Sequence, residues 1–155
     1  MKAIEIQSPN LLSRKDNYVT VFLGGSIEMD LAEPWQQKLV TAMKETSCIF
    51  YNPRRDDWDS TWKQDISDPN FNAQVTWELK ALDLADVIVM YFDPTTKSPI
   101  SLLELGLYAK SKKVIVCCPD GYWRKGNVDI VCQRFGVRNV PTFEELMSLL
   151  KSVVA

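Results

Sequence analysis

A glutamate inside an apolar, helix-like stretch is the residue of this chain best suited to chemistry. Glu104 is flanked by leucines at 102, 103, 105 and 107, and the stretch follows an apolar run at 87–92 that ends at Asp93-Pro94. A run that stops at a proline turn and is followed by helical spacing predicts a buried parallel strand leading into a helix. Ligands of open α/β sheets bind where such strands end. We therefore interpret Glu104 as a nucleophile; the alternative is a helix glutamate that reaches solvent or pairs with a lysine.

A second carboxylate, Glu78, lies on the helix predicted at about 72–84, just before the strand at 86–92. Two carboxylates near one bond can divide the work of breaking a glycosidic bond. The alternative is that Glu78 pairs with a neighbour on its own helix. The sequence contains no histidine, which excludes Ser-His-Asp and Cys-His nucleophiles and histidine bases. Acid–base work therefore falls to carboxylates, lysine, tyrosine or a bound substrate.

The turn after the first core strand could bind an anion. Gly24, Gly25, Ser26 and Ile27 follow the strand predicted at 19–23 and precede a helix. Glycines there let backbone N–H groups approach a ligand, and the start of a helix favours negative charge. The turn matches neither the dinucleotide-binding pattern nor the Walker A pattern. The alternative is a plain tight turn.

The loop at 52–58 combines arginine, aspartate and tryptophan. These groups stack on a heteroaromatic base and hydrogen-bond to it. The candidates in this loop are Arg54, Asp57 and Trp58. The alternative is a solvated loop whose arginines and aspartates pair with each other.

Polar residues near the starts of two later helices complete the candidate set. Ser98 is a predicted N-cap, and Pro99 suits the first helical position, where a missing N–H costs nothing. Ser98 and Ser101 border the predicted crevice and are candidates for substrate binding. Asn127 lies at the start of a helix predicted at about 127–134, where it either caps that helix or reaches a ligand with its amide.

Strand-like and helix-like stretches alternate along the chain, which predicts one doubly wound, parallel, five-stranded sheet with helices on both faces. The predicted strands are 19–23, 48–51, 86–92, 114–118 and 137–140, and the predicted helices are 31–45, 72–84, 98–110, 127–134 and a last one capped by Thr142. Residues 1–17 form an arm or a short edge strand of this single domain, 1–155. Right-handed crossovers place the loops after residues 23, 51, 92 and 118 along one edge of the sheet.

Composition narrows the function classes further. The chain has 155 residues, a net charge of −2 and a pI of about 5.2, so it carries no electrostatic footprint for a nucleic-acid polymer or an anionic membrane. The start of the chain lacks the apolar stretch of a signal peptide. The cysteines at 48, 117, 118 and 132 lack metal-type spacing, so we expect no metal and buried thiols in a reducing cytoplasm.

Three segments together resemble the nucleoside 2-deoxyribosyltransferase superfamily, whose relatives include the 2′-deoxynucleoside 5′-monophosphate N-glycosidases. The segments are Phe22-Leu23-Gly24-Gly25-Ser26-Ile27, Ala85-Asp86-Val87-Ile88-Val89, and Ser98 through Glu104-Leu105-Gly106. The resemblance extends over about 19–137. It implies a flavodoxin-like, Rossmann-like fold and cleavage of the N-glycosidic bond of 2′-deoxynucleosides. The nucleophilic glutamate of that family falls on Glu104, which forms a deoxyribosyl ester. The acidic partner, usually aspartate, falls on Glu78.

The resemblance also implies roles for other positions. A family tyrosine that steadies the nucleophile falls on Phe22, so either Tyr91, Tyr108 or Tyr122 replaces it or the activity is weak. Ser98 matches a serine that binds the 5′-phosphate in the hydrolase branch. Asn127 matches an asparagine that reaches a neighbouring subunit's site, which implies a homo-oligomer. With an ordinary glutamate pKa of about 4.3, Glu104 is expected to be ionised at neutral pH.

The function expected from the residues and the resemblance is transfer of deoxyribose from a nucleoside or nucleotide to a free base, without a metal or organic cofactor. One alternative is an N-glycosidase that acts on 2′-deoxynucleoside 5′-monophosphates and passes the sugar to water. The other alternative is a non-catalytic nucleotide-binding module.

Overall fold

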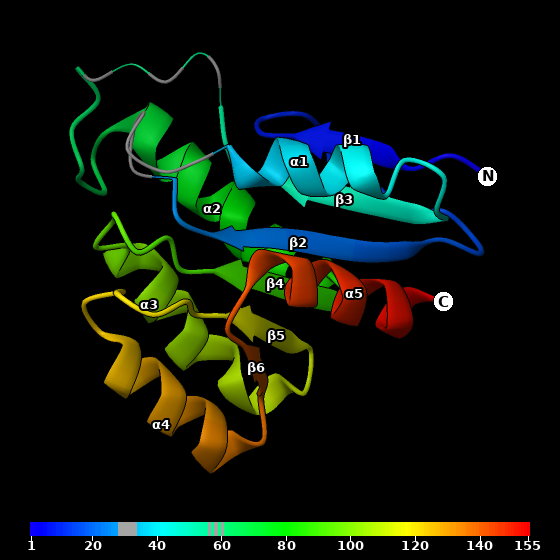
Figure 1. Ribbon diagram of the computed structural model, residues 1–155. Coiled ribbons are helices and arrows are strands. Elements are labelled where there is room, and N and C mark those ends of the chain that lie inside the picture. Colours follow the sequence, from blue (N-terminus) through cyan, green and yellow to red (C-terminus); the bar gives the residue numbers. More distant parts are fainter. Residues whose placement is uncertain (28–33, 56, 58, 60) are drawn as a thin grey trace.

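The computed structural model of the protein describes residues 1–27, 34–55, 57, 59 and 61–155. Strands and helices alternate along the chain, and all the strand pairs between described residues are parallel (Figure 1). In chain order the elements are β1 (Ile4–Gln7), β2 (Val19–Gly25), α1 (Trp35–Ala42), β3 (Cys48–Asn52), α2 (Pro69–Leu84), β4 (Val87–Tyr91), α3 (Pro99–Tyr108), the short 3₁₀ helix η1 (Ala109–Ser111), β5 (Val114–Cys117), α4 (Lys125–Phe135), β6 (Arg138–Val140) and α5 (Phe143–Val154).

In the described part of the chain, the strands form one six-stranded sheet with the order β1-β3-β2-β4-β5-β6. The prediction of five strands is therefore wrong. β1 adds a sixth strand by pairing with β3, with Ile4 opposite Ile49 and Ile6 opposite Tyr51. The short edge strand was one of the two readings of residues 1–17. The other five strands lie close to the predicted positions.

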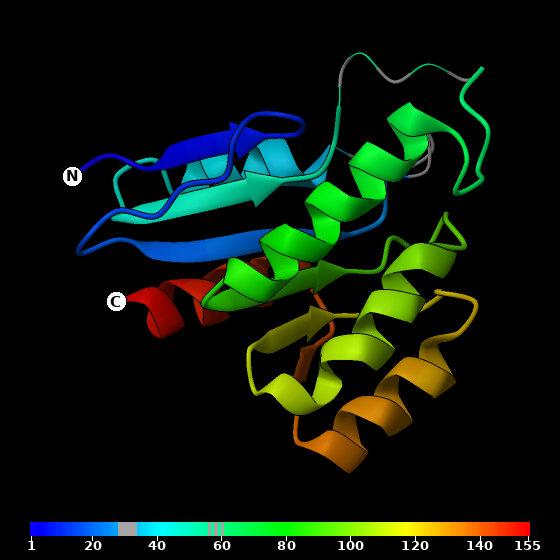
Figure 2. The ribbon, with the colours of Figure 1, turned by 180° about the vertical axis from the view of Figure 1, so that it is seen from behind.

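Helices cover both faces of the sheet, which makes the protein a single α/β domain of three layers. Figure 1 shows α1 and α5 on one face, and Figure 2 shows α2, α3 and α4 side by side on the other. Side chains alternate along each strand, so Val21 and Leu23 of β2 face α1 and α5, whereas Phe22 faces the three-helix layer. The helices contribute Trp35, Leu39, Leu146 and Leu150 to the first layer and Trp77, Ala81, Leu82, Leu105, Val128 and Cys132 to the second.

One predicted helix cap is confirmed, and the starts of two other helices are shifted by two or three residues. Thr142 caps α5 as predicted, since its side chain accepts a hydrogen bond from the Glu145 backbone N–H. Pro69, rather than a residue near 72, begins α2, because Asp68 accepts hydrogen bonds from two backbone N–H groups of the first turn. Lys125 begins α4, so Asn127 does not cap it. The helix predicted at 31–45 appears as the shorter α1; residues 31–33 lie outside the described residues.

Ser98 occupies the N-cap position of α3 but does not act as the predicted cap. Its backbone is left-handed, with φ +49°, and its side chain makes no capping hydrogen bond. The Ser98 hydroxyl instead bonds to hydroxyl groups of neighbouring loops, described below. Among the described helices, none has both the length and the apolar character needed to cross a bilayer.

Candidate active site

The loops after β2 and β4 meet at the carboxyl edge of the sheet. Because the chain continues from β2 to β3 on one side and returns to β4 on the other, the strand order reverses between β2 and β4. Such a reversal leaves a crevice outside the carboxyl ends of the two strands, where open α/β sheets bind ligands. The predicted placement of the unusual loops along one edge is confirmed by the parallel pairing.

Glu104 is a buried acid on α3. It is only 6% exposed, and no described residue donates a hydrogen bond to its carboxylate. Burial raises the pKa of Glu104 to about 8, and the negative charge of Glu78 contributes to the shift. The pKa of Glu104 therefore lies above the ordinary glutamate value on which the expectation of an ionised Glu104 was based. The solvent-facing alternative for Glu104 is wrong.

Glu78 lies on α2, the helix beside α3 in Figure 2. It is half-buried, and burial raises its pKa to about 7, with Gln74 on the preceding turn acting in the opposite direction. Among the described residues, neither Glu78 nor Glu104 takes part in an ion pair. The two carboxyls are close enough for the charge of one to raise the pKa of the other. The fold thus brings together the two acids that the sequence singled out, and a shared proton can reside on either.

Three buried hydroxyl groups link the loop after β2 to the start of α3. The Ser26 hydroxyl lies 2.9 Å from the Thr96 hydroxyl and 2.6 Å from the Ser98 hydroxyl, and the last two are 2.7 Å apart. The Asp93 backbone N–H also donates to the Ser26 hydroxyl. Ser101 is buried in the first turn of α3 and lies on the same side of the helix as Glu104, three residues further on. The predicted residues Ser26, Ser98 and Ser101 therefore lie on the crevice side.

Gly24 and Gly25 are explained by packing against β4. Gly25 has φ +128°, and a Cβ there would lie 2.6 Å from the Tyr91 backbone nitrogen and closer still to its carbonyl oxygen. At Gly24, a Cβ would lie 3.2 Å from the Phe22 ring and from the Val89 carbonyl oxygen. The tight-turn reading therefore accounts for both glycines without a ligand. They place Ser26 and the partly buried Ile27 at the crevice.

Arg54 is connected to the crevice through Gln36, a residue that the sequence analysis missed. Arg54 donates from Nη1 to Gln36 Oε1 at 3.3 Å, and Gln36 donates from Nε2 to the Ser26 carbonyl oxygen at 3.5 Å. Gln36 is almost completely buried on α1. The sequence did contain a signal for Gln36. It precedes the apolar residues Leu39 and Val40 by three and four positions, so it lies on the apolar face of the helix, where a polar side chain needs a hydrogen-bond partner.

The rest of the loop after β3 forms its own ion pair. Arg55 binds the Asp57 carboxylate through two hydrogen bonds of 2.8 and 2.9 Å and lies over the Trp62 ring at 4.8 Å. For Asp57, the alternative of arginine–aspartate pairing therefore describes the structure. Arg55 also donates to Gln74 Oε1, which ties this loop to α2 one turn before Glu78. Trp58 lies outside the described residues.

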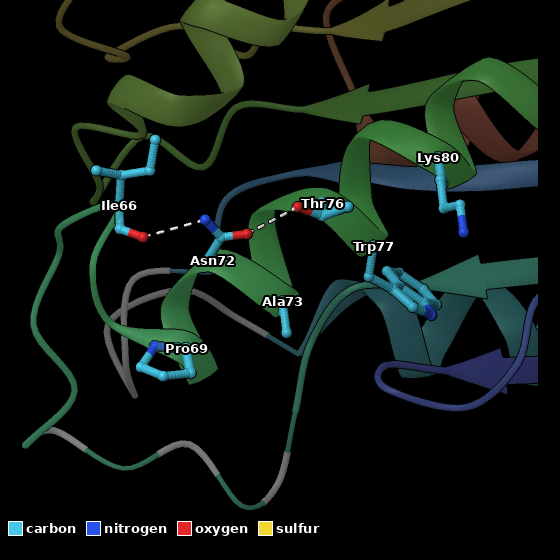
Figure 3. Close-up of a pocket in the computed structure, with 7 residues that line it drawn as sticks. All are labelled: Ile66, Pro69, Asn72, Ala73, Thr76, Trp77 and Lys80. Atoms are coloured by element: carbon cyan, nitrogen blue, oxygen red, sulfur yellow. Dashed lines mark hydrogen bonds between the residues drawn. The ribbon is translucent and has the colours of Figure 1, made fainter.

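Two hollows elsewhere on the surface do not contain the acid pair. One hollow of about 430 Å³ lies along α2, and Figure 3 shows the residues that line it. There the Asn72 side chain donates to the Ile66 carbonyl oxygen and accepts from the Thr76 hydroxyl. The other residues that line this hollow are Pro69, Ala73, Trp77 and Lys80. Glu78 stands two residues from Thr76 and from Lys80, so it points to another side of the helix. A second hollow of about 310 Å³ lies between α3 and α4.

The model of the family described as nucleoside 2-deoxyribosyltransferase like matches residues 18–122. The chain belongs to the nucleoside 2-deoxyribosyltransferase-like family. A crystal structure of a conserved protein from Enterococcus faecalis V583 has the same fold, with a TM-score of 0.61 and 14% sequence identity; the match covers 86% of this chain and 98% of that one. No curated protein matches the chain significantly.

The deoxyribosyltransferase-like resemblance predicted a tyrosine to replace Phe22 beside the nucleophile. Tyr91 faces α1 and α5, on the other side of the sheet from Glu104. Tyr122 donates from its hydroxyl to the Lys97 carbonyl oxygen at 2.6 Å. Tyr108 donates to Asp83 at 2.5 Å, and burial, Asp83 and the charge of Glu104 raise its pKa to about 12. The charge of Glu104 therefore reaches Tyr108, at the end of the same helix.

Two further expectations concern Asn127 and metals. Asn127 is exposed and lines the hollow between α3 and α4, so within one chain it lies outside the acid pair's surroundings. Within the part of the chain that the structure describes, no group of three histidine, cysteine or acidic residues could hold a metal ion. The four cysteines are free and buried. Thr96, like Gln36, was missed, and its place in a short loop offered no sequence signal.

Proposed function

We propose that the protein cleaves the N-glycosidic bond of a 2′-deoxynucleoside and transfers the sugar to another base through a covalent ester on Glu104. The observation that carries the proposal is a pair of neighbouring carboxyls on α2 and α3, the half-buried Glu78 and the buried Glu104, beside the crevice of a deoxyribosyltransferase-like chain. Taking acids out of water lowers the stability of the folded protein, so two such acids side by side point to a functional role.

The proposed reaction has two balanced steps. The Glu104 carboxylate attacks the anomeric carbon while the bond to the base nitrogen breaks, and that nitrogen takes the bonding electrons and a proton from Glu78. A ring nitrogen of the second base then attacks the same carbon and gives its proton to Glu78, the ester bond breaks, and Glu104 regains its negative charge. The negative charge of Glu104 stabilises the oxocarbenium-like transition state.

The raised pKa values suit this division of work. A pair of carboxyls with pKa values near 7 and 8 retains a proton at neutral pH. When that proton resides on Glu78, Glu104 is the nucleophile and Glu78 is the acid for the leaving base. Entry of the sugar next to Glu104 favours this arrangement, because positive charge develops on the sugar and attracts the carboxylate beside it.

We assign the base side of the site to the loop after β3, including Arg54, and the sugar side to Ser26, Ser98 and Ser101. The link from Arg54 through Gln36 to Ser26 supports this placement, because it holds a cation beside the crevice. The strand order without β1 is β3-β2-β4-β5-β6, which supports a flavodoxin-like core extended by one edge strand. Four free thiols support a cytoplasmic location.

A specific observation favours one alternative, hydrolysis of 2′-deoxynucleoside 5′-monophosphates. The Ser26, Thr96 and Ser98 hydroxyls cluster at the start of α3, where hydroxyl groups and backbone N–H groups suit a phosphate. In this reaction water, rather than a second base, takes the sugar from Glu104. The non-catalytic binding module is the remaining alternative.

Incubation of the protein with a deoxynucleoside and a different free base tests the proposal. Exchange of the bases supports transfer, and release of deoxyribose or its 5-phosphate supports hydrolysis. The same assay with and without a 5′-phosphate on the substrate shows which substrate is used. Binding by calorimetry without any product after long incubation would favour the non-catalytic module. Ser98→Ala should weaken binding of the phosphorylated substrate more than that of the unphosphorylated one.

A further inference from the structure

Gln74 is a buried polar residue on α2, one turn before Glu78. It is only 5% exposed and lies on the side of the helix that carries the core residues Trp77 and Ala81. A buried amide lowers the stability of the fold unless its oxygen and its N–H groups find hydrogen-bond partners. The partners of Gln74 come from two other parts of the chain and from Glu78, and they indicate what this residue does.

The Gln74 oxygen accepts hydrogen bonds from two segments that are distant from α2 in the sequence. The Ser8 hydroxyl, just after β1, donates to Oε1 at 2.5 Å. Arg55, in the loop after β3, donates from Nη1 to the same oxygen at 3.4 Å. These donors fix the orientation of the amide, because an inverted amide would place its N–H groups against a guanidinium, which has no acceptor.

The Gln74 nitrogen has acceptors on the other side of the amide. One N–H donates to the Pro53 carbonyl oxygen at 3.0 Å. An amide nitrogen carries two N–H groups, so a second donor remains. Glu78 lies four residues further along α2, on the same side of the helix, and the Gln74 side chain hydrogen-bonds to its carboxyl. Because the amide oxygen is already occupied, the second N–H is the group that meets Glu78.

We propose that Gln74 is a positioning residue for Glu78, and that its second N–H stabilises the carboxylate that forms when Glu78 gives its proton to the leaving base. A donor that bonds to the charged form of a carboxyl favours that form. The same hydrogen bond holds the Glu78 side chain on the side of α2 that faces the loop after β3. This role rests on the proposed function, whereas the hydrogen bond itself belongs to the unliganded protein.

The charges around the acid pair agree with this role. Burial raises the pKa of Glu78 to about 7, and the hydrogen bond from Gln74 opposes that rise. Glu104, on α3, has no such donor among the described residues, and burial together with the charge of Glu78 raises its pKa to about 8. The cation Arg55 approaches from the loop after β3, but it bonds to the Gln74 oxygen. Gln74 thus makes the two acids unequal, with Glu78 the one that releases its proton more readily.

The edge strand β1 supports the groups that orient the Gln74 oxygen. Ser8 follows β1 directly, and its backbone N–H donates to the Asn52 carbonyl oxygen at 3.0 Å. Gln7, the last residue of β1, donates from Nε2 to the Arg54 carbonyl oxygen at 2.8 Å. The loop after β3 is therefore held by β1 on one side and by Gln74 on the other. Of these contacts, only those of Gln74 reach Glu78.

Titration of the Glu78 side-chain carboxyl, followed by carbon NMR in a Glu104→Gln background, tests the proposal without any need for turnover. In that background one acid of the pair titrates, so the midpoint belongs to Glu78. Gln74→Met keeps the length of the side chain and removes its N–H groups. We expect it to raise the midpoint by about one pH unit, because a hydrogen bond to a charged group is lost. A midpoint that stays the same or falls would overturn the proposal.

A second variant guards against misfolding of Gln74→Met. Gln74→Glu has the same shape and keeps an oxygen for Ser8 and Arg55, but it lacks both N–H groups. It should raise the Glu78 midpoint at least as much, since the lost donor is replaced by a group of like charge. An unchanged or lower midpoint in this variant would overturn the proposal in the same way.

Gln7→Met is the matched control. It removes a hydrogen bond between β1 and the loop after β3 but none of the contacts of Gln74, so it should leave the Glu78 midpoint unchanged. A shift as large as that of Gln74→Met would mean that a loosened loop causes the effect, and the positioning role would be wrong.

Kinetics connect the hydrogen bond to the proposed reaction. In the transfer assay with Glu104 intact, Gln74→Met should lower kcat by about threefold to tenfold with little change in KM, and should move the alkaline limb of the kcat profile to higher pH. A raised KM with an unchanged kcat would overturn the role. A wild-type chain without turnover would count against the proposed function, and the NMR titration would still decide whether Gln74 holds Glu78.

Discussion

The helices on the two faces of the sheet differ in what they expose and what they bury. On α5 the exposed residues are polar, namely Glu144, Glu145, Ser148, Lys151 and Ser152, and the fully buried ones are Leu146 and Leu150. On α3 the exposed residues are apolar or glycine, and the buried ones include Ser101 and Glu104. The two helices have similar lengths and pack on the same sheet, so the sheet does not cause the difference.

The contrast shows two separate departures from the ordinary pattern of a surface helix. α5 follows that pattern, with one apolar stripe toward the core and polar groups outside. In α3 the polar residues on the inner side indicate a functional site. A buried acid lowers the stability of the folded protein, and such departures from the ordinary pattern are expected at functional sites. The apolar residues on the outer side, Ile100, Leu103 and Leu107, are exposed to water, which is unusual for a surface helix. Each departure can be tested by changing one residue.

The largest expected effect is on activity. Glu104→Gln should lower turnover by at least about a thousandfold, because the amide cannot form the glycosyl ester. Binding of a deoxynucleoside, measured by calorimetry, should be retained, since the change keeps the shape of the side chain. The matched control is Glu144→Gln on α5, which should leave turnover unchanged. Turnover that survives Glu104→Gln would remove this residue from the mechanism.

The next effect is on stability and compares leucines on the two faces. Leu146→Ala should lower the free energy of unfolding by about 2–5 kcal/mol, because Leu146 is fully buried between α5 and the sheet. Leu103→Ala should change it by no more than about 0.5 kcal/mol in the monomer, since the side chain is already exposed. Urea denaturation at one low protein concentration measures both. Equal losses would mean that α3 and α5 contribute to the monomer in the same way.

A smaller effect should appear in the pH dependence of stability. The pKa of Glu104 rises from its ordinary 4.5 to about 8 on folding, so between these pH values the folded protein keeps a proton that the unfolded chain releases. The free energy of unfolding should therefore fall as pH rises, by at most about 1.4 kcal/mol per pH unit for this group. Glu78 adds to the fall up to about pH 7. Glu104→Gln should flatten the profile, and Glu144→Gln should not.

The smallest expected effect is on substrate binding and concerns Gln36. This residue lies on α1, on the same face of the sheet as α5, and its side chain reaches the loop after β2 at the crevice. Gln36→Leu removes the acceptor for Arg54 and should raise KM by about threefold to tenfold, with a smaller change in kcat, because a hydrogen bond of a charged group is worth about 1.5–3 kcal/mol at most. Gln36→Glu keeps an acceptor for Arg54 and should restore KM in part. Equal effects of both variants would indicate a purely structural role.

Most of the fold could be predicted from the sequence, because apolar runs and helical spacing are local signals. The strands from β2 to β6 and the Thr142 cap appear where those signals placed them. β1 was left open as an arm or a strand, since four residues carry too little pattern. The prediction that Ser98 caps α3 was wrong, because its hydroxyl bonds to the hydroxyls of Ser26 and Thr96 instead. Ser26 follows a different strand, β2, so the tertiary structure brings it to Ser98.

The two acids of the candidate site could be predicted from the sequence, whereas the contacts of the residues around them could not. Glu104 stood out because a carboxylate interrupts an apolar helix. The pairing of Asp57 with Arg55 and the link from Arg54 to Gln36 could not be separated in the sequence, since both arginines adjoin the same strand end. Gly25 looked like a ligand-binding glycine, whereas the close approach of β4 accounts for it.

The sequence by itself determined the alternation of strands and helices, the family and the two candidate acids, because these depend on residue types and their spacing along the chain. Only the tertiary structure decided that Glu78 and Glu104 lie together in a poorly hydrated place, and that their pKa values rise in consequence. It also decided that Leu103 and Leu107 of α3 face outward while Leu146 and Leu150 of α5 face the sheet. Burial and charge coupling depend on which helices pack side by side, and spacing along a chain does not specify that.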